Sequence, residues 1–590
     1  MVLLVGWSKE TSVDGTEFES PNRDVFRYAL LTVTFFFVVY YFYFWLIVKN
    51  SFDDLNWDLF GKLKTWIPWY RVLLGLVCAT FAYLFILMLY FVYCVLRGRP
   101  LRLHVVHVII TVTILVFCVV FTIGINILWA SEWTTVYLSL KIMGPFLHIG
   151  AVAIMTSVSW IVSLQYCRMS SCACKLFVMS VYVSLMFQLY VSPLFINSPC
   201  VVSPDNLPRK PRTVAHRGAS GIVPENTFMS FRYAEKYDAY VFETDVRISF
   251  DGVPFLLHDK TFRRTTNVAD VFPEMVDMDA SLFNISQIKS LNAGSWFLNK
   301  NPMWSAGDLS DEERKEVANQ TIPTLREAVE VVQLAGKRIM FDLMVPSPRH
   351  PYHNKTVQLV IDAIKAANLE LKKVWWLQHT ANNSRPGGVT LVAEEYHPLS
   401  MMRRENMSIV NVQYTELSRQ NIDEYRDANI SVNVWTVNSM WFFSLYWCMG
   451  VHSITSNMCH QIHALHSPVW HLAPDSYRIL WLTVDVMSII IIMTVFIVQI
   501  IRMHGISCGS DMPCFDETSK HYKRKSTNSK EKLLYDGSES NSERTNHIPR
   551  QTCDIISQPS SYPMSNMNYS SYGPGFHSNS CYPDNKYDME

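Results

Sequence analysis

The sequence predicts an α/β protein: a (β/α)8 barrel of the TIM type outside the membrane, joined to an α-helical transmembrane region of six helices. Two observations predict this fold class. Long apolar runs lie in the N-terminal third and near the C-terminal end, and between residues 211 and 456 short β-rich runs alternate with helical patterns. With 590 residues, the chain is also too long for one ordinary domain.

Six apolar runs form the predicted transmembrane region. Each run is long enough, at ~1.5 Å per residue, to cross the ~30 Å hydrocarbon layer of a bilayer as a helix. The first run follows a polar segment and lacks a small-residue cleavage site, so we interpret it as an anchor rather than a signal peptide. The predicted spans are Tyr28 to Val48, Val72 to Leu96, Val105 to Trp129, Ile142 to Leu164, Leu176 to Ile196 and Ile479 to Ile501.

Basic residues near the spans predict the orientation in the membrane. Arg97, Arg99 and Arg102 lie in the short loop between the second and third spans, and Arg502 and the run KHYKRK follow the sixth. If these segments are cytoplasmic, both termini are cytoplasmic and the barrel is extracellular or lumenal. We therefore expect a multi-pass protein of the plasma membrane or the secretory pathway.

Six N-x-[ST] sequons lie in the segment predicted to be outside the cytosol, which agrees with this orientation. Chance matches are frequent, so each sequon alone is weak, and the clustering carries the weight. The glycosylation candidates are Asn284, Asn319, Asn354, Asn382, Asn406 and Asn429.

The predicted organisation has five parts. Residues 1–27 form a cytoplasmic segment, 28–196 five transmembrane helices, 197–477 the outer barrel, 478–502 the sixth helix and 503–590 a cytoplasmic tail. The tail is rich in Ser, Asn, Tyr and Pro and poor in aliphatic residues, which favours disorder. Residues from about 268 to 320 break the β/α rhythm and are interpreted as an insertion over one end of the barrel.

Charge and cysteine content narrow the classes of function. The formal net charge is zero, so nothing favours a nucleic-acid partner. Of the 13 cysteines, only Cys200, Cys448 and Cys459 lie in the outer segment, which allows one disulfide and leaves its connectivity open.

The alternation of strands and helices predicts the barrel itself. A β-then-α repeat implies parallel strands with covering helices, and a length near 250 residues favours closure over an open sheet. The strand candidates are TVAHRG, YVFETDVRIS, PFLLHD, RIMFDLM, KVWWLQ, IVNVQYT and SVNVWTV. The helix candidates are ENTFMSFRYAEKY, TLREAVEVVQLAG, NKTVQLVIDAIKAAN and RQNIDEYRDAN.

The run YVFETDVRIS carries the strongest chemical signal. Because side chains alternate along a strand, Glu243, Asp245 and Arg247 share one face with Val241, opposite an apolar face suited to the covering helices. The charged face then points into the barrel, where two adjacent carboxylates are costly unless a divalent cation, Ca²⁺ or Mg²⁺, lies between them. RIMFDLM repeats this pattern, which makes Asp342 a candidate third metal ligand.

Two histidines close predicted strands in the same manner. His216 ends TVAH and precedes Arg217, and His258 ends PFLLH. Imidazoles beside a metal site can pass a proton to a leaving oxygen and accept one from a nucleophile. The planar guanidinium of Arg217 suits phosphate oxygens. Together these residues indicate metal-assisted phosphodiester chemistry.

AHRGASGIVPENTFMSF followed by FETDVRISFDGVPFLLHDKTFRRTT resembles the glycerophosphodiester phosphodiesterases, with their pattern of HRG, P-E-N-T, E-x-D, D-G-x-P, H-D and R-T-T. Five spans before the barrel and one after it resemble the six-spanning membrane branch of that family. The resemblance implies that His216 and His258 are the acid and base pair, that Arg217 contacts the phosphate, and that Glu243, Asp245 and Asp342 hold the metal. It also implies attack on phosphorus by a neighbouring substrate hydroxyl, giving a cyclic phosphate that water opens.

Two departures from the family pattern stand out. Where the family usually has Glu-x-Lys, this chain has Asp342-Leu343-Met344. Loss of a charged hydrogen bond of ~1.5–3 kcal/mol would slow turnover by one to two orders of magnitude, with Arg247 a candidate substitute. In GVHSITSN, an Asp common in the family is replaced by His452 and Ser456, which we expect to reshape the rim of the site.

Several of these candidate site residues also have a purely structural explanation. Glu243 and Asp245 taken alone fit a solvated edge strand, and a lone strand-end histidine such as His258 is often held by a backbone carbonyl. Asn226 and Thr227 suit the first turn of a helix at least as well as catalysis.

The favoured hypothesis is a membrane-anchored hydrolase of glycerol- or inositol-bearing phosphodiesters. Its substrates would be soluble glycerophosphodiesters or the phosphodiester of a GPI anchor, next to the lipid bilayer. The alternative is a membrane scaffold or receptor with a catalytically weakened barrel, for which Met344 would be the first sign of decay. A transporter is disfavoured by the shortage of paired charges in the spans.

Overall fold

The computed structural model describes residues 21–504 except 98, 100 and 379–385. Within these residues lie a set of long apolar helices and a closed barrel. Residues 1–20, the sequon at Asn382 and the tail beyond residue 504 lie outside the described residues.

Among the described residues, six helices are long and apolar enough to cross a membrane, and each predicted span overlaps one of them. The multi-pass prediction is thereby confirmed, while the orientation stays a prediction. The six candidate spans are Phe26–Leu63, Trp69–Arg97, Val105–Leu128, Glu132–Arg168, Cys172–Leu194 and Pro474–Met503.

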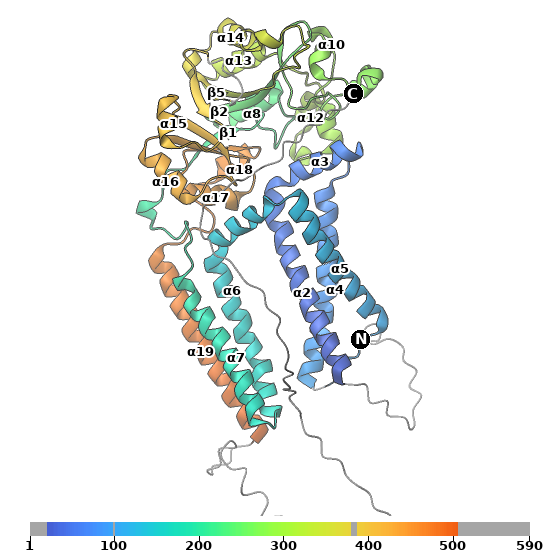
Figure 1. The fold of residues 1–590 in the computed structure, drawn as a ribbon, viewed down its shortest axis with the longest axis vertical. Helices are drawn as coiled ribbons and strands as arrows, with labels where there is room; N and C mark the ends of the chain where they lie inside the picture. The colour runs from blue at the N-terminus through green and yellow to red at the C-terminus, as the bar shows by residue number, and fades with distance from the viewer. Residues whose placement is uncertain (1–20, 98, 100, 379–385, 505–590) are drawn as a thin grey trace, which may run out of the picture. The chain divides into compact units, whose positions relative to one another are not determined.

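These helices pack in two groups, as Figure 1 shows: α2 beside α4 and α5, and α6 beside α7 and α19. Polar side chains join the helices of each group, since Tyr41 of α2 donates to the carbonyl of Cys118 in α5 at 2.8 Å. The helices are α2 (Pro21–Ile47), α4 (Trp69–Arg97), α5 (Val105–Leu128), α6 (Glu132–Arg168), α7 (Cys172–Val191) and α19 (Pro474–His504).

The first span continues past α2 into a short polar connection. A 3-10 turn, η1 (Val48–Ser51), leads into helix α3 (Phe52–Leu63), which carries Asp53, Asp54 and Asp58. At 38 residues, the continuous segment from Phe26 to Leu63 is longer than the ~20 residues that a bilayer requires. The charged α3 is therefore the part that extends beyond the hydrocarbon layer.

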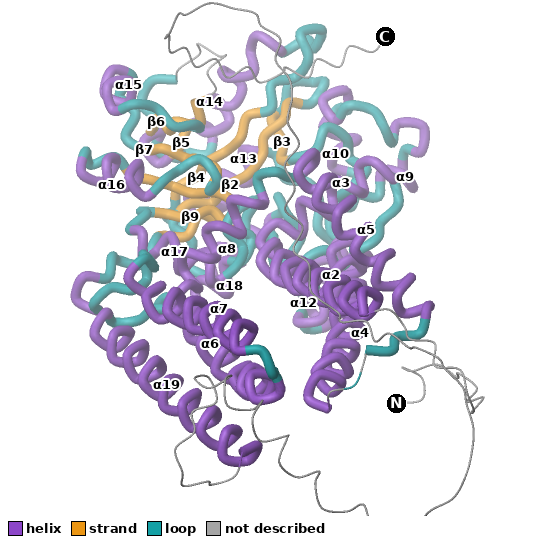
Figure 2. The backbone as a smooth tube through the Cα atoms, turned by 60° about the horizontal axis from the view of Figure 1, so that its bottom comes forward, coloured by secondary structure: helices purple, strands orange, loops and turns teal. Residues whose placement is uncertain are grey.

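The barrel closes as predicted. Eight parallel strands follow one another around it, and β1 pairs with both β2 and β9, which leaves no open edge. The strands lie together with helices around them in Figure 2. The strands are β1 (Arg212–Ala215), β2 (Val241–Ile248), β4 (Arg338–Leu343), β5 (Val374–Gln378), β6 (Thr390–Ala393), β7 (Ile409–Gln413), β8 (Ser431–Trp435) and β9 (Ser453–Ser456).

Seven helices follow barrel strands, and the four predicted ones, α8, α13, α14 and α16, are all present. Capping boxes start several of them, for example at Thr324 ahead of α13. The barrel helices are α8 (Phe228–Lys236), α13 (Leu325–Leu334), α14 (Thr356–Ala366), α15 (Leu399–Arg404), α16 (Arg419–Asp427), α17 (Met440–Met449) and α18 (Cys459–Ala464).

The predicted faces of β2 are confirmed. Phe242, Val246 and Ile248 pack outward against the buried residues of α8, α13 and α14. Val241 instead belongs to an interior layer that fills the barrel below the charged residues. Glu243 and Asp245 continue the inward face toward the carboxyl ends of the strands, the end of such barrels at which active sites form.

One of the predicted strands is present but does not belong to the closed barrel. PFLLHD forms β3 (Pro254–Leu256), which runs antiparallel to β2 and lies outside the closed barrel. Two barrel strands were not predicted, β6 with its run TLVA and β9 with its run SITS. Each is four residues long, which is too short to show a clear periodicity.

The predicted insertion folds as a set of short helices, and its Phe283 and Ile288 share an apolar cluster with Phe262 of the preceding loop. It contacts α3, because the rings of Trp57 of α3 and Trp296 lie 5.8 Å apart. Its helices are α9 (Val268–Val271), α10 (Ile285–Lys289), α11 (Ser295–Lys300) and α12 (Asp311–Ala318).

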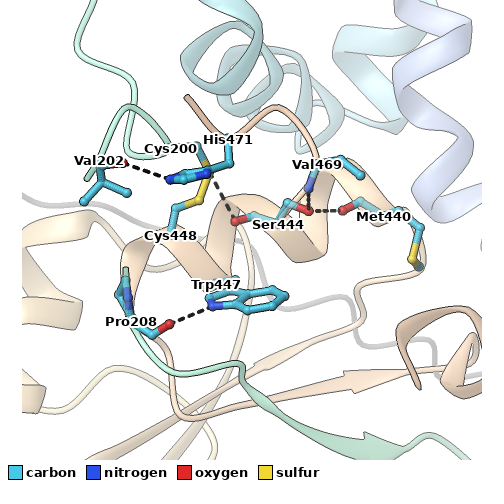
Figure 3. Close-up of a disulfide and its surroundings, with 9 residues drawn as sticks. All are labelled: Cys200, Val202, Pro208, Met440, Ser444, Trp447, Cys448, Val469 and His471. Atoms are coloured by element: carbon cyan, nitrogen blue, oxygen red, sulfur yellow. Dashed lines mark hydrogen bonds between the residues drawn. A yellow bond between two sulfur atoms is a disulfide. The ribbon is translucent and has the colours of Figure 1, made fainter. Parts of the chain in front are cut away.

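A disulfide joins the entry of the barrel to α17. Cys200, in the segment between α7 and β1, is bonded to Cys448, and Cys459 is a free, buried thiol. Figure 3 shows this bond with its neighbours, in which Trp447 donates to the carbonyl of Pro208 at 2.8 Å. The chain leaving the barrel passes the same point, since Val469 donates its amide to Ser444 of α17 at 2.9 Å. Both connections to the membrane helices are thus tied to one helix.

Candidate active site

One cavity of about 490 Å³ at the carboxyl ends of the barrel strands brings together all the predicted site residues. The loops after β1 and β3 supply the two histidines, and β2 and β4 supply the carboxylates. The predicted residues that line it are His216, Arg217, Glu243, Asp245, His258 and Asp342.

The turn after β1 explains the HRG sequence. Arg217 and Gly218 both have positive φ, 54° and 77°, so the chain turns sharply as β1 ends. A Cβ at Gly218 would lie 2.3 Å from the hydroxyl of Ser230, which only glycine avoids. This turn aims the backbone N–H of Arg217 at Oε2 of Glu243, 2.7 Å away.

The side chain of His216 is partly buried and is held from one side. Its Nδ1 lies 2.5 Å from Oδ1 of Asn457, and its Nε2 lies 4.0 Å from Oε2 of Glu243. Burial, followed by the charge of Arg217, lowers the pKa of His216 to about 3. The imidazole is therefore neutral near pH 7 and can accept a proton.

The carboxylates lie on paired strands. Asp245 of β2 is in register with Asp342 of β4, and Glu243 precedes Asp245 on the same face. Burial, and then the charge of Asp245, raises the pKa of Glu243 well above its usual value. Burial and the crowding of negative charge therefore both disfavour an ionised Glu243 at this wall of the cavity.

The donor set fits a hard divalent cation. Three carboxylates from two adjacent strands face one cavity, and oxygen ligands of this kind suit Ca²⁺ or Mg²⁺. Among the described residues, no group of three His, Cys, Asp or Glu side chains is arranged as a ready metal site. Glu243, Asp245 and Asp342 therefore share a cavity without forming a closed coordination shell.

An ion-pair network that the sequence analysis missed surrounds Arg217. Its Nη1 lies 3.1 Å from Oε1 of Glu225, and its Nε lies 3.4 Å from Oδ2 of Asp245. Arg264, the arginine of the R-T-T motif, pairs with both Glu225 and Asp259. The family pattern contained these residues, and their pairing could have been suspected from it.

His258 has a carboxylate partner rather than a backbone one. Its Nδ1 lies 2.8 Å from Oδ1 of Asp259, and an ionised carboxylate only accepts, so Nδ1 carries the proton. Its own carbonyl accepts from Nη2 of Arg247 at 2.9 Å. Arg247 thus supports the His258 loop, and burial lowers its pKa.

The structural explanation for Asn226 and Thr227, that they start a helix, holds for Thr227 but not for Asn226. Thr227 is the N-cap of α8, as the structural explanation expected. Asn226, with φ of 54°, instead turns inward, donates to Oδ2 of Asp245 at 2.9 Å and accepts from the hydroxyl of Thr244 at 2.6 Å. Asn226 belongs to the site because it orients a carboxylate.

The expectation that GVHSITSN reshapes the rim is wrong for His452, whereas Ser456 bonds a residue of the loop that follows β8. His452 lies at the amino end of β9, where its Nδ1 accepts from the amide of Val432, and so it is remote from the rim. Ser456 bonds the amide of Met458 and the side chain of Asn438. The residue of this segment that reaches the site is Asn457.

Helix α3 also contributes to the cavity, which no sequence pattern indicated. Asp54 lines it together with His216 and His258. The ring of Trp57 lies 4.8 Å from the guanidinium carbon of Arg264. The segment that follows the first membrane span therefore forms part of the wall of the site.

Comparison with known proteins identifies the family. Residues 216–460 match the model of the Glycerophosphoryl diester phosphodiesterase family. The chain is 36% identical over 512 residues to Glycerophosphodiester phosphodiesterase domain-containing protein 5 of Homo sapiens, covering 86% of this chain and 84% of the relative. This chain belongs to the glycerophosphodiester phosphodiesterase family.

Two further proteins, one relative and one of solved structure, are also similar to this chain. The chain is 36% identical over 477 residues to the glycerophosphoinositol inositolphosphodiesterase of Mus musculus, covering 81% of this chain and 88% of the relative. A solved Oleispira antarctica phosphodiesterase, in complex with the product sn-glycerol-3-phosphate, is 22% identical with a TM-score of 0.34. It covers 43% of this chain and 96% of its own. The phosphodiesterase membership fits the two histidines and three carboxylates of the cavity.

Proposed function

We propose that this phosphodiesterase hydrolyses glycerol- or inositol-bearing phosphodiesters at the outer face of a membrane, with a divalent cation as cofactor. The observation that carries the proposal is the single cavity that His216, His258, Arg217 and three carboxylates line together. The substrates are soluble glycerophosphodiesters or the phosphodiester of a GPI anchor. Glycerophosphoinositol is the first to test, because a mouse relative bears its name.

His216 acts as the base. Its neutral ring accepts at Nε2 the proton of the substrate hydroxyl next to the phosphoester, and that oxygen forms a bond to phosphorus. His258, with Nδ1 held by Asp259, gives a proton to the leaving oxygen as the old P–O bond breaks. Water then opens the cyclic phosphate, and Arg217 binds phosphate oxygens throughout.

Glu243, Asp245 and Asp342 hold the cation. When bound, a divalent cation supplies positive charge that stabilises the negative charge developing on the phosphoryl oxygens. Its charge also opposes the burial and the repulsion from Asp245 that together raise the pKa of Glu243. Asn226 keeps one oxygen of Asp245 occupied, so that the carboxylate presents the other to the cavity.

Two features support the outer location of the barrel, and a third agrees with six spans in either orientation. The disulfide between Cys200 and Cys448 is typical of an oxidising compartment. Side chains of the connection between the first two spans bond to the barrel, which requires both on one side of the membrane, as six spans do whichever side the termini occupy. The sequon asparagines among the described residues, Asn284, Asn319, Asn354, Asn406 and Asn429, are all exposed.

The test uses the full-length protein in lipid nanodiscs with glycerophosphoinositol, glycerophosphocholine and a GPI-anchored protein. Cleavage of at least one substrate is expected, with loss on adding a chelator, recovery on adding Ca²⁺ or Mg²⁺, and loss in His216→Ala. Equal product from the wild type, the chelated sample and His216→Ala would contradict the proposal. That outcome would favour the alternative, a membrane scaffold or receptor with a catalytically weakened barrel.

A further inference from the structure

The connection after the first membrane span is anchored in the rim of the barrel. Asn50, a buried residue of η1, donates to the carbonyl of Thr436 at 3.0 Å. Its Oδ1 accepts from the amides of Asn438 and Ser439 at 2.7 and 3.1 Å. These bonds fix the backbone just before α3 against the loop that follows β8.

Asp53 lies one helical turn after Asn50 and points to the same rim. Its Oδ2 accepts from Nδ2 of Asn457 at 2.8 Å, and the side chains of both residues are buried. The backbone of Asn457 is held in turn by Asn438, whose Oδ1 accepts from its amide at 2.9 Å. The same loop residue therefore positions both members of the Asp53 and Asn457 pair.

The pair decides which atom of Asn457 faces His216. The atom of Asn457 beside Asp53 is Nδ2 of the NH₂ group, which donates to Oδ2 of Asp53, so the amide oxygen points the other way. That oxygen lies 2.5 Å from Nδ1 of His216 and 3.0 Å from the hydroxyl of Ser220, both of which can donate to it. Nδ1 consequently carries the proton of the neutral ring, and Nε2 keeps its lone pair on the side of the cavity.

We propose that Asp53 is a positioning residue for the reaction, which acts through Asn457 to hold His216 in the tautomer and orientation that leave Nε2 free to accept a proton. This inference rests on the proposed function, because it concerns the base of that reaction. It assigns part of the catalytic arrangement to the membrane-helix region, since Asp53 lies on α3 and not in the barrel. Without Asp53, the amide of Asn457 can rotate and present NH₂ to His216, which stabilises the wrong tautomer.

Exchanging the side chains of Asp53 and Asn457 distinguishes a positioning role of Asp53 from a purely structural one. In Asn457→Asp, two carboxylates face each other across 2.8 Å, so their repulsion disturbs the site. In the double variant Asp53→Asn with Asn457→Asp, the amide introduced at position 53 donates to the carboxylate introduced at position 457. That carboxylate still accepts from His216 and Ser220, so the double variant keeps every hydrogen bond of the wild type.

The experiment measures kcat and KM of the full-length protein in nanodiscs, on whichever glycerophosphodiester the wild type cleaves best. Asp53→Ala is expected to lower kcat roughly 10- to 100-fold, with KM changed by less than about threefold, as supporting residues of a site typically do. Asn457→Asp alone is expected to lose a similar factor, and the double variant to recover to within about threefold of the wild type. Asp58→Ala, an exposed carboxylate on the same helix, serves as the control and should match the wild type.

Each contrary outcome has a separate meaning. Wild-type kcat in Asp53→Ala, or a double variant no more active than Asn457→Asp, would overturn the role of Asp53 while leaving the proposed function in place. Loss of folding in both Asp53→Ala and the double variant, judged by thermal unfolding, would assign Asp53 a structural role and overturn the inference. A wild type no more active than His216→Ala would remove the proposed function, and the inference with it.

Discussion

Arg264 binds Glu225 through two parallel hydrogen bonds, from Nη1 to Oε2 at 2.8 Å and from Nη2 to Oε1 at 2.6 Å. Both side chains are buried beneath the cavity. Burial raises the pKa of Glu225, but the charges of Arg264 and Arg217 outweigh it and lower the pKa to about 2. Breaking this pair would leave two buried guanidinium groups each with one carboxylate partner fewer, since Arg264 would keep Asp259 and Arg217 would keep Asp245.

Glu225→Gln is therefore expected to destabilise the protein by about 3 kcal/mol or more at pH 7. Because the folded pKa of Glu225 lies below its unfolded value of 4.5, this stabilisation is complete above pH 4.5 and is lost as the pH falls toward 2. In thermal unfolding, the difference in stability between Glu225→Gln and the wild type should become smaller from pH 5 to pH 3. The control is Glu330→Gln, which removes an exposed ion pair with Arg326 on α13 and should change neither the stability nor its dependence on pH. A stability difference between Glu225→Gln and the wild type that does not change with pH would contradict the low pKa of Glu225.

Asn226 and Thr227 are adjacent residues with separable roles. Asn226→Ala is expected to lower kcat/KM roughly 10- to 100-fold, because Asp245 loses the donor that orients it. Thr227→Ala removes the N-cap of α8 and should cost about 1 kcal/mol of stability while leaving kcat unchanged. Steady-state kinetics and thermal unfolding of both variants test this. Equal effects of the two substitutions on kcat would mean that both residues act only through the helix.

Much of the fold could be predicted from periodicity. The six apolar runs and the strands and helices with strong alternation, such as β2 and α13, needed only local patterns. Helix α17 and strand β6 could not be predicted in this way. All but the first two residues of α17 are buried, so its sequence MWFFSLYWCM has no polar face to mark a period, and β6 is only four residues long.

The residues of the candidate active site also divide into those that local sequence patterns indicated and those that they did not. His216, His258, Glu243 and Asp245 end or line strands, so alternation and strand ends indicated that they would meet. Asp53 and Asn457 are separated by 404 residues, and their contact depends on how a membrane connection docks on the barrel rim. Only the tertiary structure contains that information, which is why no sequence pattern placed α3 in the site.

Met344 replaces the lysine that the family usually has two residues after its carboxylate. Met344→Lys is expected to raise kcat/KM about tenfold, since a charged hydrogen bond of ~1.5–3 kcal/mol would be restored near Asp342. Kinetics of the variant beside Met344→Leu, which keeps the site uncharged, test this. If the lysine variant matches the wild type, another cation already fills the role, and Arg247→Met, which would then lower the rate, identifies it.

The orientation can be tested with sequons already present. Asn354 and Asn406 are exposed on the barrel, whereas the sequon at Asn568 lies in the tail predicted to be cytoplasmic. If the barrel is outside the cytosol, treatment with peptide-N-glycosidase should increase the electrophoretic mobility of protein made in secretory-pathway cells. Asn354→Gln and Asn406→Gln should each remove part of that shift, and Asn568→Gln none. A shift that depends on Asn568 alone would reverse the orientation, because glycans are added only on the lumenal side.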